Sequence, residues 1–389
     1  MNTELVERVR LRLAGNGSRT DPAAVAEAIR AEAGGPVGHA DVLDALRVLR
    51  QEFTGAGPLE PLLAEPGVTD VLVSSPDEVW VDGETGLRRI DLRFPGEESV
   101  RRLAQRLALA AGRRLDDAQP YVDGWLPGSG PRGRVRLHAV LPPIAADGTC
   151  ISLRVLRPAA HDLPALRALG TFDDEGVAIV GAVVAARLAF LVTGGTGAGK
   201  STLLSAMLGA VSPAERIVSV EDAGELQPAH PQFVRLVARP PNIEGAGEIT
   251  LRDLVRQALR MRPDRLVVGE VRGREVCELL NALNTGHDGG ACTLHANSPA
   301  EVPARLEALA ALGGLSRLAL HSQLAAAVQL VLHMRRSASG QRRLAEIGVL
   351  SRDQEGLVRV LPVWEGGTWT KRRIVLSALF EQRGVKPPW

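Results

Sequence analysis

The sequence predicts an α/β protein whose larger part contains a mainly parallel sheet. Three observations predict this class: a glycine-rich phosphate-loop motif, strand-like and helix-like segments that alternate around it, and an earlier region where short strands accompany a single helix. At 389 residues the chain is too long for one ordinary core, so we expect more than one folded unit.

Changes in the spacing of apolar residues divide the chain into four parts. Residues 1–52 show helical spacing without strands, so we expect a short helical N-terminal extension. Residues 53–157 combine short strands with one helix and are expected to form a smaller α+β domain. We expect a linker over 158–175 and a P-loop domain over 176–389, which ends in a small β extension at 335–389.

Composition and charge argue against several classes of protein. Apolar residues make up 45% of the chain and charged residues 23%, which excludes a largely disordered protein. The net charge of +1 gives no general attraction for a polyanion, and aromatic residues at 3% leave little for base stacking, so nucleic acid is not an expected partner. Three scattered cysteines are too few for a disulfide framework or a four-cysteine zinc site, which favours a reducing compartment.

No segment has the character of a signal peptide or of a membrane span. The first residues interleave charged and apolar side chains. The most apolar stretch, 177–193, contains Arg187 and is shorter than the ~20 apolar residues that a span needs. We therefore expect a soluble chain with no transmembrane segment of its own.

The most informative motif is the segment GGTGAGKST, which fits GxxxxGK[ST] at every fixed position. Its members, all expected to bind the nucleotide, are Gly194, Gly195, Thr196, Gly197, Ala198, Gly199, Lys200, Ser201 and Thr202. An apolar run suited to a buried strand precedes the motif and a predicted helix follows it. Backbone N–H groups can therefore form an anion nest at a helix N-terminus.

Two side chains of this motif carry specific expectations. Lys200, one of only three lysines, should lie along the β- and γ-phosphates, and Ser201 should supply a hydroxyl to Mg²⁺. The expected cofactors are therefore ATP and Mg²⁺. A glycine-rich turn with an incidental lysine is the less favoured interpretation.

Acidic residues follow two apolar strand-like runs after the loop. Glu270 ends the run 266–270, where it could orient or activate the attacking water. Glu221 and Asp222 close the run 216–220 in the same way. An ordinary acid at a strand end is the alternative for each, so the phosphate loop is what makes catalytic roles the favoured interpretation.

Two histidines lie in a segment rich in glycine and threonine. His287 and His295 follow the two acidic strand ends, and His295 is a candidate sensor of the γ-phosphate. An ordinary hydrogen-bonded histidine is an equally favoured interpretation. A zinc site is not expected, because no partners at metal-ligand spacing are evident.

These motifs, in this order, resemble the secretion-ATPase superfamily that powers type II secretion, type IV pili and type IV secretion. Four boxes carry the resemblance: the phosphate loop 194–202, an acidic box VEDAGEL at 220–226, a Walker B-like box at 259–273 and a histidine box at 284–299. Segments such as GAGPLEPLL and RLHAVLPP in the smaller domain are similar to the branch that drives tight-adherence (Tad/Flp) pili, the TadA/CpaF-type ATPases.

The resemblance implies a homo-hexameric ring with ATP bound between an N-terminal domain and a RecA-like motor domain. It also implies that arginines of the N-terminal domain reach the γ-phosphate, and the matching residues here are Arg136 and Arg154. Two departures affect that region, since the chain has Val122-Asp123-Gly124-Trp125 where the family tends to have an arginine after VDA, and 128–133 looks like a small insertion. The family's implied partners are pilus or secretion platform proteins of the inner membrane. Its implied location is cytoplasmic and peripheral at the membrane's cytoplasmic face.

The predicted helix Leu251–Met261 places three arginines on one face at a spacing of four residues, namely Arg252, Arg256 and Arg260. Like charges at this spacing repel unless an anion or an acidic partner compensates. A basic stripe at a subunit junction is the favoured interpretation, and a solvated or ion-paired face is the alternative.

Three functions remain as hypotheses. The first is an ATP-hydrolysing hexameric motor that powers pilus assembly or protein secretion at the cytoplasmic membrane. The absence of the retraction ATPases' C-terminal motif favours assembly. The second is a conjugation-type secretion ATPase serving DNA transfer, and the third is a P-loop kinase for a small acceptor. A G protein is disfavoured because no NKxD motif is present.

Overall fold

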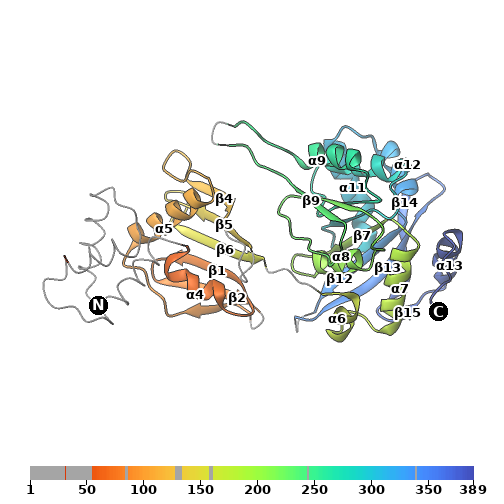
Figure 1. Ribbon diagram of the computed structural model, residues 1–389, viewed down its shortest axis with the longest axis horizontal. Helices are drawn as coiled ribbons and strands as arrows, with labels where there is room; N and C mark the ends of the chain where they lie inside the picture. The colour runs from red at the N-terminus through yellow and green to blue at the C-terminus, as the bar shows by residue number, and fades with distance from the viewer. Residues whose placement is uncertain are drawn as a thin grey trace. The chain divides into compact units, whose positions relative to one another are not determined.

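The computed structural model describes most of the chain, apart from the beginning and a few short segments. The described residues are Ala31, 55–83, 86–127, 134–156, 161–242, 245–337 and 340–389. They belong to two compact units, Met1–Arg157 and Pro158–Trp389 (Figure 1). The helical extension expected over 1–52, apart from Ala31, and the small insertion expected at 128–133 lie outside the described residues.

The first unit contains a six-stranded antiparallel sheet in the order β3-β2-β1-β6-β5-β4. The strands are β1 (Val68–Ser75), β2 (Glu78–Gly83), β3 (Arg88–Ile90), β4 (Tyr121–Trp125), β5 (Arg134–Val140) and β6 (Cys150–Leu156). Over the described residues 55–156, the helical elements are η1 (Gly57–Leu59), α4 (Glu60–Ala64) and α5 (Glu97–Ala110).

Alternation of buried and more exposed residues explains why these segments form a sheet with one covered face. On β5, for example, Leu137 and Ala139 are buried and Arg136 and His138 are not. The buried side chains pack with the apolar stripe of α5, which includes Leu107. The predicted α+β pattern of short strands with one long helix is therefore present here.

The second unit contains a nine-stranded sheet in the order β15-β14-β13-β12-β7-β11-β10-β8-β9. The strands are β7 (Phe190–Gly194), β8 (Ile217–Glu221), β9 (Phe233–Val237), β10 (Arg265–Val268), β11 (Ala291–Leu294), β12 (Leu330–Arg336), β13 (Arg342–Arg352), β14 (Val358–Glu365) and β15 (Thr368–Trp369). The neighbouring strands β12, β7, β11, β10, β8 and β9 are parallel, as the alternating pattern predicts. At the other side of the sheet, β12, β13, β14 and β15 pair antiparallel with one another in that order. The expected small β extension is thus a continuation of the main sheet.

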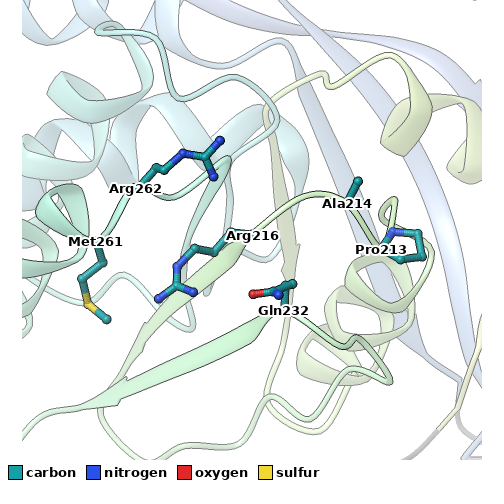
Figure 2. A pocket seen from close by; sticks show the side chains of 6 residues that line it. All are labelled: Pro213, Ala214, Arg216, Gln232, Met261 and Arg262. Carbon is teal, nitrogen blue, oxygen red and sulfur yellow. The ribbon is translucent and has the colours of Figure 1, made fainter.

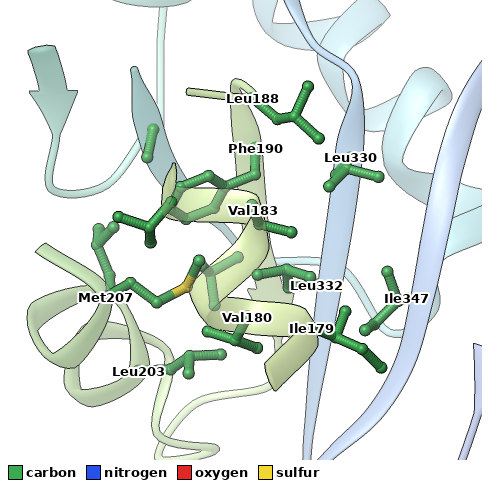
Figure 3. Close-up of a cluster of buried hydrophobic side chains, with 14 of the residues drawn as sticks. Ile179, Val180, Val183, Leu188, Phe190, Leu203, Met207, Leu330, Leu332 and Ile347 are labelled. Atoms are coloured by element: carbon green, nitrogen blue, oxygen red, sulfur yellow. The ribbon is translucent and has the colours of Figure 1, made fainter. Parts of the chain in front are cut away.

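Helices cover both faces of this sheet. They are α6 (Leu163–Ala168), α7 (Asp174–Ala185), α8 (Lys200–Gly209), α9 (Leu251–Ala258), η2 (Leu259–Met261), α10 (Glu275–Leu283), η3 (Pro299–Glu301), α11 (Val302–Leu312), α12 (Arg317–Ala327) and α13 (Arg373–Gln382). Successive strand residues point to opposite faces, so Phe190 packs into one buried cluster and Leu191 into the other. Figure 3 shows Val180 and Val183 of α7 beside Phe190 in the first cluster.

The described part of the segment expected to be a linker forms a helix. Asp162 caps α6, because its side chain accepts a hydrogen bond from the backbone N–H of Ala165. Leu163 and Leu166 are buried in the same cluster as α7 and α8. Proline at the first turn of a helix is well tolerated, so Pro164 starts this short helix instead of marking a loop.

In the described part of the chain, no helix is both long enough and apolar enough to cross a membrane. Because neighbouring parallel strands run in one direction, the carboxyl ends of β7, β8, β10 and β11 meet at one edge of the sheet. The motifs found in the sequence follow these four strands.

Candidate active site

The phosphate-loop motif connects the end of β7 directly to the start of α8. Gly194 ends the strand with φ +145°, and a Cβ there would lie 2.3 Å from the carbonyl oxygen of Met334, so only glycine fits. Gly199 precedes α8 with φ +93°, a left-handed conformation that glycine adopts without strain. The loop therefore ends at a helix N-terminus, where backbone N–H groups and the helix dipole favour an anion.

The ammonium group of Lys200 lies across this loop. Its Nζ atom donates hydrogen bonds to the carbonyl oxygens of Gly194 at 3.1 Å and Gly195 at 2.9 Å. Burial lowers the pKa of Lys200 below its ordinary value, while the charge of Glu270 opposes that effect. A phosphate bound at the loop would place a negative charge beside this desolvated amine and so favour its charged form.

Ser201 lies beside a carboxylate that sequence reasoning did not single out. Its Oγ atom donates to Oε2 of Glu225 at 3.2 Å. Glu225 belongs to the acidic box 220–226, and Gly224, with φ +63°, turns the chain just before it. The acidic box could have indicated Glu225. Sequence reasoning selected Glu221 and Asp222 instead, because these two acids lie directly at the end of the strand-like run.

Glu221 lies in the interior, away from solvent. Its side chain is 3% exposed, and it accepts hydrogen bonds from Ser219 Oγ at 3.0 Å and from the backbone N–H of Leu226 at 2.8 Å. Arg235 Nε lies 3.4 Å from the same carboxylate, whose pKa burial raises. These contacts hold the turn that presents Glu225, so the geometry favours a positioning role for Glu221.

Glu270 and His295 meet at the carboxyl edge of the sheet. Glu270 comes just after β10 and His295 just after β11. His295 Nε2 lies 2.9 Å from Oε1 of Glu270 without the alignment of a hydrogen bond, so this buried oxygen has no donor among the described residues. The other oxygen, Oε2, accepts from Arg272 at 2.6 Å.

His295 also approaches the lysine of the loop. Its Nε2 atom lies 3.4 Å from Nζ of Lys200. Burial lowers the pKa of His295, and the positive charge of Lys200 lowers it further. A neutral ring at physiological pH can accept or donate a hydrogen bond at this position. His287 does not join this group, because its Nδ1 atom contacts the carbonyl oxygen of Ala282 at the end of α10.

Two cavities flank the loop. One, of about 360 Å³, is lined by Gly194, Gly195, His295, Ala296, Asn297, Glu301 and Arg305. The other, of about 240 Å³, is lined by His161, Leu166, Leu169, Thr171, Gly199, Thr202, Leu203, Met334, Gly340, Gln341 and Arg342. The first borders the side of the loop where His295 lies, and the second borders the start of α8 and is more apolar.

Arg342 of β13 is a further loop contact that the sequence did not reveal. Its Nε atom donates to the carbonyl oxygen of Gly197 at 3.0 Å. The two residues are separated by 145 positions in the chain, so no local pattern could have linked them. The antiparallel edge of the sheet thus supports the phosphate loop directly.

The oxygen atoms near Ser201 fit the requirements of Mg²⁺. The ion prefers a hydroxyl and one or two carboxylates, together with phosphate oxygens and waters. The Ser201 hydroxyl and the Glu225 carboxylate supply that chemistry. Across the described ranges, no group of three or more His, Cys, Asp or Glu side chains could hold a metal by itself.

Arg136 and Arg154 lie in the first unit, directly opposite each other on β5 and β6. Arg136 donates to both carboxylate oxygens of Asp123, at 2.9 and 2.7 Å. Arg154 donates to Asp70 at 2.8 Å. Burial alone would raise the pKa of Asp123, but the bond from Arg136 lowers it overall. Asp123 is therefore a bidentate partner of Arg136.

The predicted arginine stripe runs from α9 into η2, and two of its arginines, Arg252 and Arg256, are ion-paired. Arg252 and Arg256 both contact Oε1 of Glu278 on α10. The acidic partner that like charges require is thus within the same unit, and the ion-paired alternative is confirmed for these two residues.

Comparison with known proteins identifies the family. Residues 52–358 match the family described as type II/IV secretion system protein, and the chain belongs to that family. A Mycobacterium tuberculosis (strain H37Rv) protein, described provisionally as a conjugal transfer protein, is 68% identical over 84% of this chain and 93% of its own length. The type IV secretion system protein PtlH of Bordetella pertussis is 30% identical over 73% of this chain and 91% of its own.

Solved structures show the same fold. The crystal structure of the pilus retraction motor PilT with bound ADP aligns with a TM-score of 0.52 and 20% identity, over 83% of this chain and 86% of that one. The predicted fold class is thereby confirmed: a RecA-like P-loop domain preceded by a smaller α+β domain.

Proposed function

We propose that the chain is a Mg²⁺-dependent ATPase whose second unit binds and hydrolyses ATP. One observation carries the proposal: Lys200, Ser201, Glu225, Glu270 and His295 converge on a single phosphate loop at the carboxyl edge of a parallel sheet. Phosphoryl transfer needs chiefly positioning and charge neutralisation, and these groups supply both.

Different residues are proposed to bind the phosphates, the Mg²⁺ ion and the attacking water. Backbone N–H groups of 194–202 and the ammonium of Lys200 bind the phosphates, while Ser201 and Glu225 provide oxygen atoms for Mg²⁺. The bound ion would neutralise charge on the phosphate oxygens. Glu270 orients the attacking water, and His295 responds to the γ-phosphate from the same side. Of the nine motif residues, Gly199 and Thr202 line the more apolar cavity, which suits the nucleoside.

The test compares two variants of the full chain. Lys200→Ala should lose ATP binding in calorimetry, because it removes the charge that faces the phosphates. Glu270→Gln should keep binding and lose turnover. Binding of ATP by the lysine variant at wild-type affinity, or hydrolysis by the Glu270 variant at the wild-type rate, would contradict the assignment.

We further propose that six copies form a ring that powers pilus assembly or protein secretion from the cytoplasmic face of the membrane, with platform proteins of that membrane as partners. Family membership and the similarity to PtlH and PilT support this step. The tight-adherence branch rests on the sequence segments named above. Light scattering of the ATP-bound protein tests the stoichiometry, and a monomer at all concentrations would contradict it.

The catalytic roles of Arg136 and Arg154 are proposed from the same resemblance. Arg136→Gln and Arg154→Gln should each lower the hydrolysis rate while ATP affinity is kept. Arg134→Gln, a change on the same strand in an arginine that packs over Trp125, is the matched control. Equal activity in all three variants would remove the two arginines from the mechanism.

Conjugative DNA transfer is the second candidate function. The observation that favours it is the 68% identity to a protein described provisionally as a conjugal transfer protein. DNA-stimulated ATP hydrolysis that weakens with added salt would support it. Hydrolysis that is indifferent to DNA but stimulated by detergent-solubilised platform proteins would favour pilus or protein secretion.

A further inference from the structure

A second concave site lies in the P-loop unit, at the opposite edge of the sheet from the phosphate loop. Three connections that precede parallel strands meet there: the segment between α8 and β8, the residue before β9, and the end of η2 before β10. They form a cavity of about 350 Å³ (Figure 2). Its lining residues are Pro213, Ala214, Arg216, Gln232, Met261 and Arg262.

The residues that line this cavity carry only positive charge. Two guanidinium groups and one amide line it, and none of the six lining residues carries a carboxylate. By contrast, the neighbouring arginines Arg187 and Arg265 both contact Glu215. The lining residues therefore supply no negative charge, and the Asp264 carboxylate, outside the lining, lies 4.0 Å from the Arg262 guanidinium.

Arg216 is held in place while its side chain keeps a free donor. Its backbone N–H donates to Oδ2 of Asp264 at 2.7 Å, and its carbonyl oxygen accepts from the backbone of Asp264 and Arg265. Its Nε atom is buried and has no hydrogen-bond partner among the described residues. A buried donor of this kind costs free energy until an acceptor is supplied.

Arg262 is the second cation available to the cavity. Its side chain is 85% exposed, and its closest carboxylate oxygen, on Asp264, lies 4.0 Å away. That oxygen already accepts the backbone hydrogen bond of Arg216. In Figure 2 Arg262 and Met261 extend from the adjacent end of η2 beside Arg216. The Arg262 guanidinium is therefore free to approach an anion that Arg216 binds.

We propose that this cavity binds a phosphate group, at a site separate from the phosphate loop. Two guanidinium groups match the double negative charge of a phosphate, and their planar donors suit its oxygens. Gln232 adds amide donors, and Met261 and Pro213 provide an apolar wall against which the carbon part of a phosphate ester can pack. A free phosphate compound and a phospholipid headgroup share this chemistry.

The test uses the full chain with Lys200→Ala, so that phosphate binding at the nucleotide loop is suppressed. Titration with inorganic phosphate at constant ionic strength should show binding in this background. Adding Arg216→Gln or Arg262→Gln should weaken it at least about tenfold, the effect expected for loss of a charge-assisted hydrogen bond. Arg260→Gln is the matched control, because Arg260 precedes Met261 on η2 but does not line the cavity.

Two results of the phosphate titration would overturn the proposal. Phosphate binding that vanishes with Lys200→Ala alone, or that is unchanged by Arg216→Gln and Arg262→Gln, overturns the proposal. Arg262 is so exposed that its variant should fold, which keeps the test valid if Arg216→Gln unfolds.

A second arm identifies the source of the phosphate. Sedimentation with phosphatidylcholine vesicles, with and without phosphatidic acid, shows whether Arg216 and Arg262 recognise a lipid headgroup. Vesicle binding that depends on these arginines assigns a lipid, and binding of soluble phosphate alone assigns a free compound. Failure of ATP binding by the wild-type chain would contradict the proposed ATPase without affecting either arm.

Discussion

Glu270 Oε1 lies 2.9 Å from His295 Nε2, and the same histidine nitrogen lies 3.4 Å from Nζ of Lys200. A single imidazole thus links the phosphate-binding amine to the carboxylate at the end of β10. Any group that enters between the loop and Glu270 must displace or engage this ring. In the proposed mechanism this ring makes nucleotide binding and water activation depend on each other, and the following predictions result.

Replacement of His295 should separate binding from turnover. His295→Asn removes the ring that contacts both Lys200 and Glu270, so we expect ATP hydrolysis to fall about a hundredfold or more with little change in ATP affinity. Steady-state kinetics and calorimetry measure the two effects. His287→Asn is the matched control, because the hydrogen bond of the His287 ring within the described residues is to the backbone carbonyl of Ala282 on α10. An equal loss in both variants would contradict the assignment.

The requirement for Mg²⁺ should depend on Glu225. Glu225→Gln keeps the size of the side chain and removes the charge beside Ser201, so we expect the Mg²⁺ concentration for half-maximal hydrolysis to rise about tenfold. Titration of activity with Mg²⁺ at saturating ATP measures this shift. Glu248→Gln, in an exposed carboxylate elsewhere in the unit, is a control that should leave the Mg²⁺ dependence unchanged.

Arg342 should contribute to ATP affinity through the shape of the loop. Arg342→Gln removes the hydrogen bond to the Gly197 carbonyl, so we expect the KM for ATP to rise several-fold while kcat changes little. Arg352→Gln lies at the other end of β13, where the arginine contacts Gly356, and serves as the control. A fall in kcat with unchanged KM would instead place Arg342 in the chemical step.

The stability of the second unit should decrease in mild acid because of His333. Its Nδ1 atom lies 3.0 Å from Thr193 Oγ1, just before the phosphate loop, and burial lowers its pKa. The unfolded chain then binds a proton more readily than the folded one. The stabilisation is therefore complete above the ordinary histidine pKa of about 6.5 and is lost as pH falls toward the folded pKa.

Thermal unfolding at about pH 7.5 and about pH 5.5 checks this effect, since the two values lie on either side of the ordinary pKa. His333→Gln should reduce the difference between the two melting temperatures. An identical pH dependence in the wild type and the variant would show that other groups cause the acid sensitivity.

The sequence predicted those parts of the site that depend on neighbouring residues. The strand, loop and helix around Lys200 follow from one local motif, and Glu270 follows from an apolar run that ends in an acid. Glu225 was not identified, because the turn at Gly224 decides which acid of the box faces Ser201. Arg342 was not identified, because pairing between β12 and β13 brings it to the loop from a distant part of the chain.

Strand pairing also explains why two other features were not predicted from the sequence. The bond between Arg136 and Asp123 depends on the register of β4 with β5, which the residue pattern alone leaves undetermined. The joining of β13 to β12 in one sheet depends on pairing between strands that the sequence shows only as separate apolar runs. Strand identity was thus predictable from alternation, whereas neighbours within the sheet were not.

Gly269 and Glu221 leave no spare room between the ends of two adjacent strands. A Cβ at position 269 would lie 2.7 Å from Cγ of Glu221, so even alanine would have to push the buried carboxylate away from Ser219 and Leu226. The backbone at the end of β10 and the Glu221 side chain at the end of β8 are therefore in close contact. A side chain added at position 269 should therefore disturb the turn that carries Glu225 as well as the backbone that leads to Glu270.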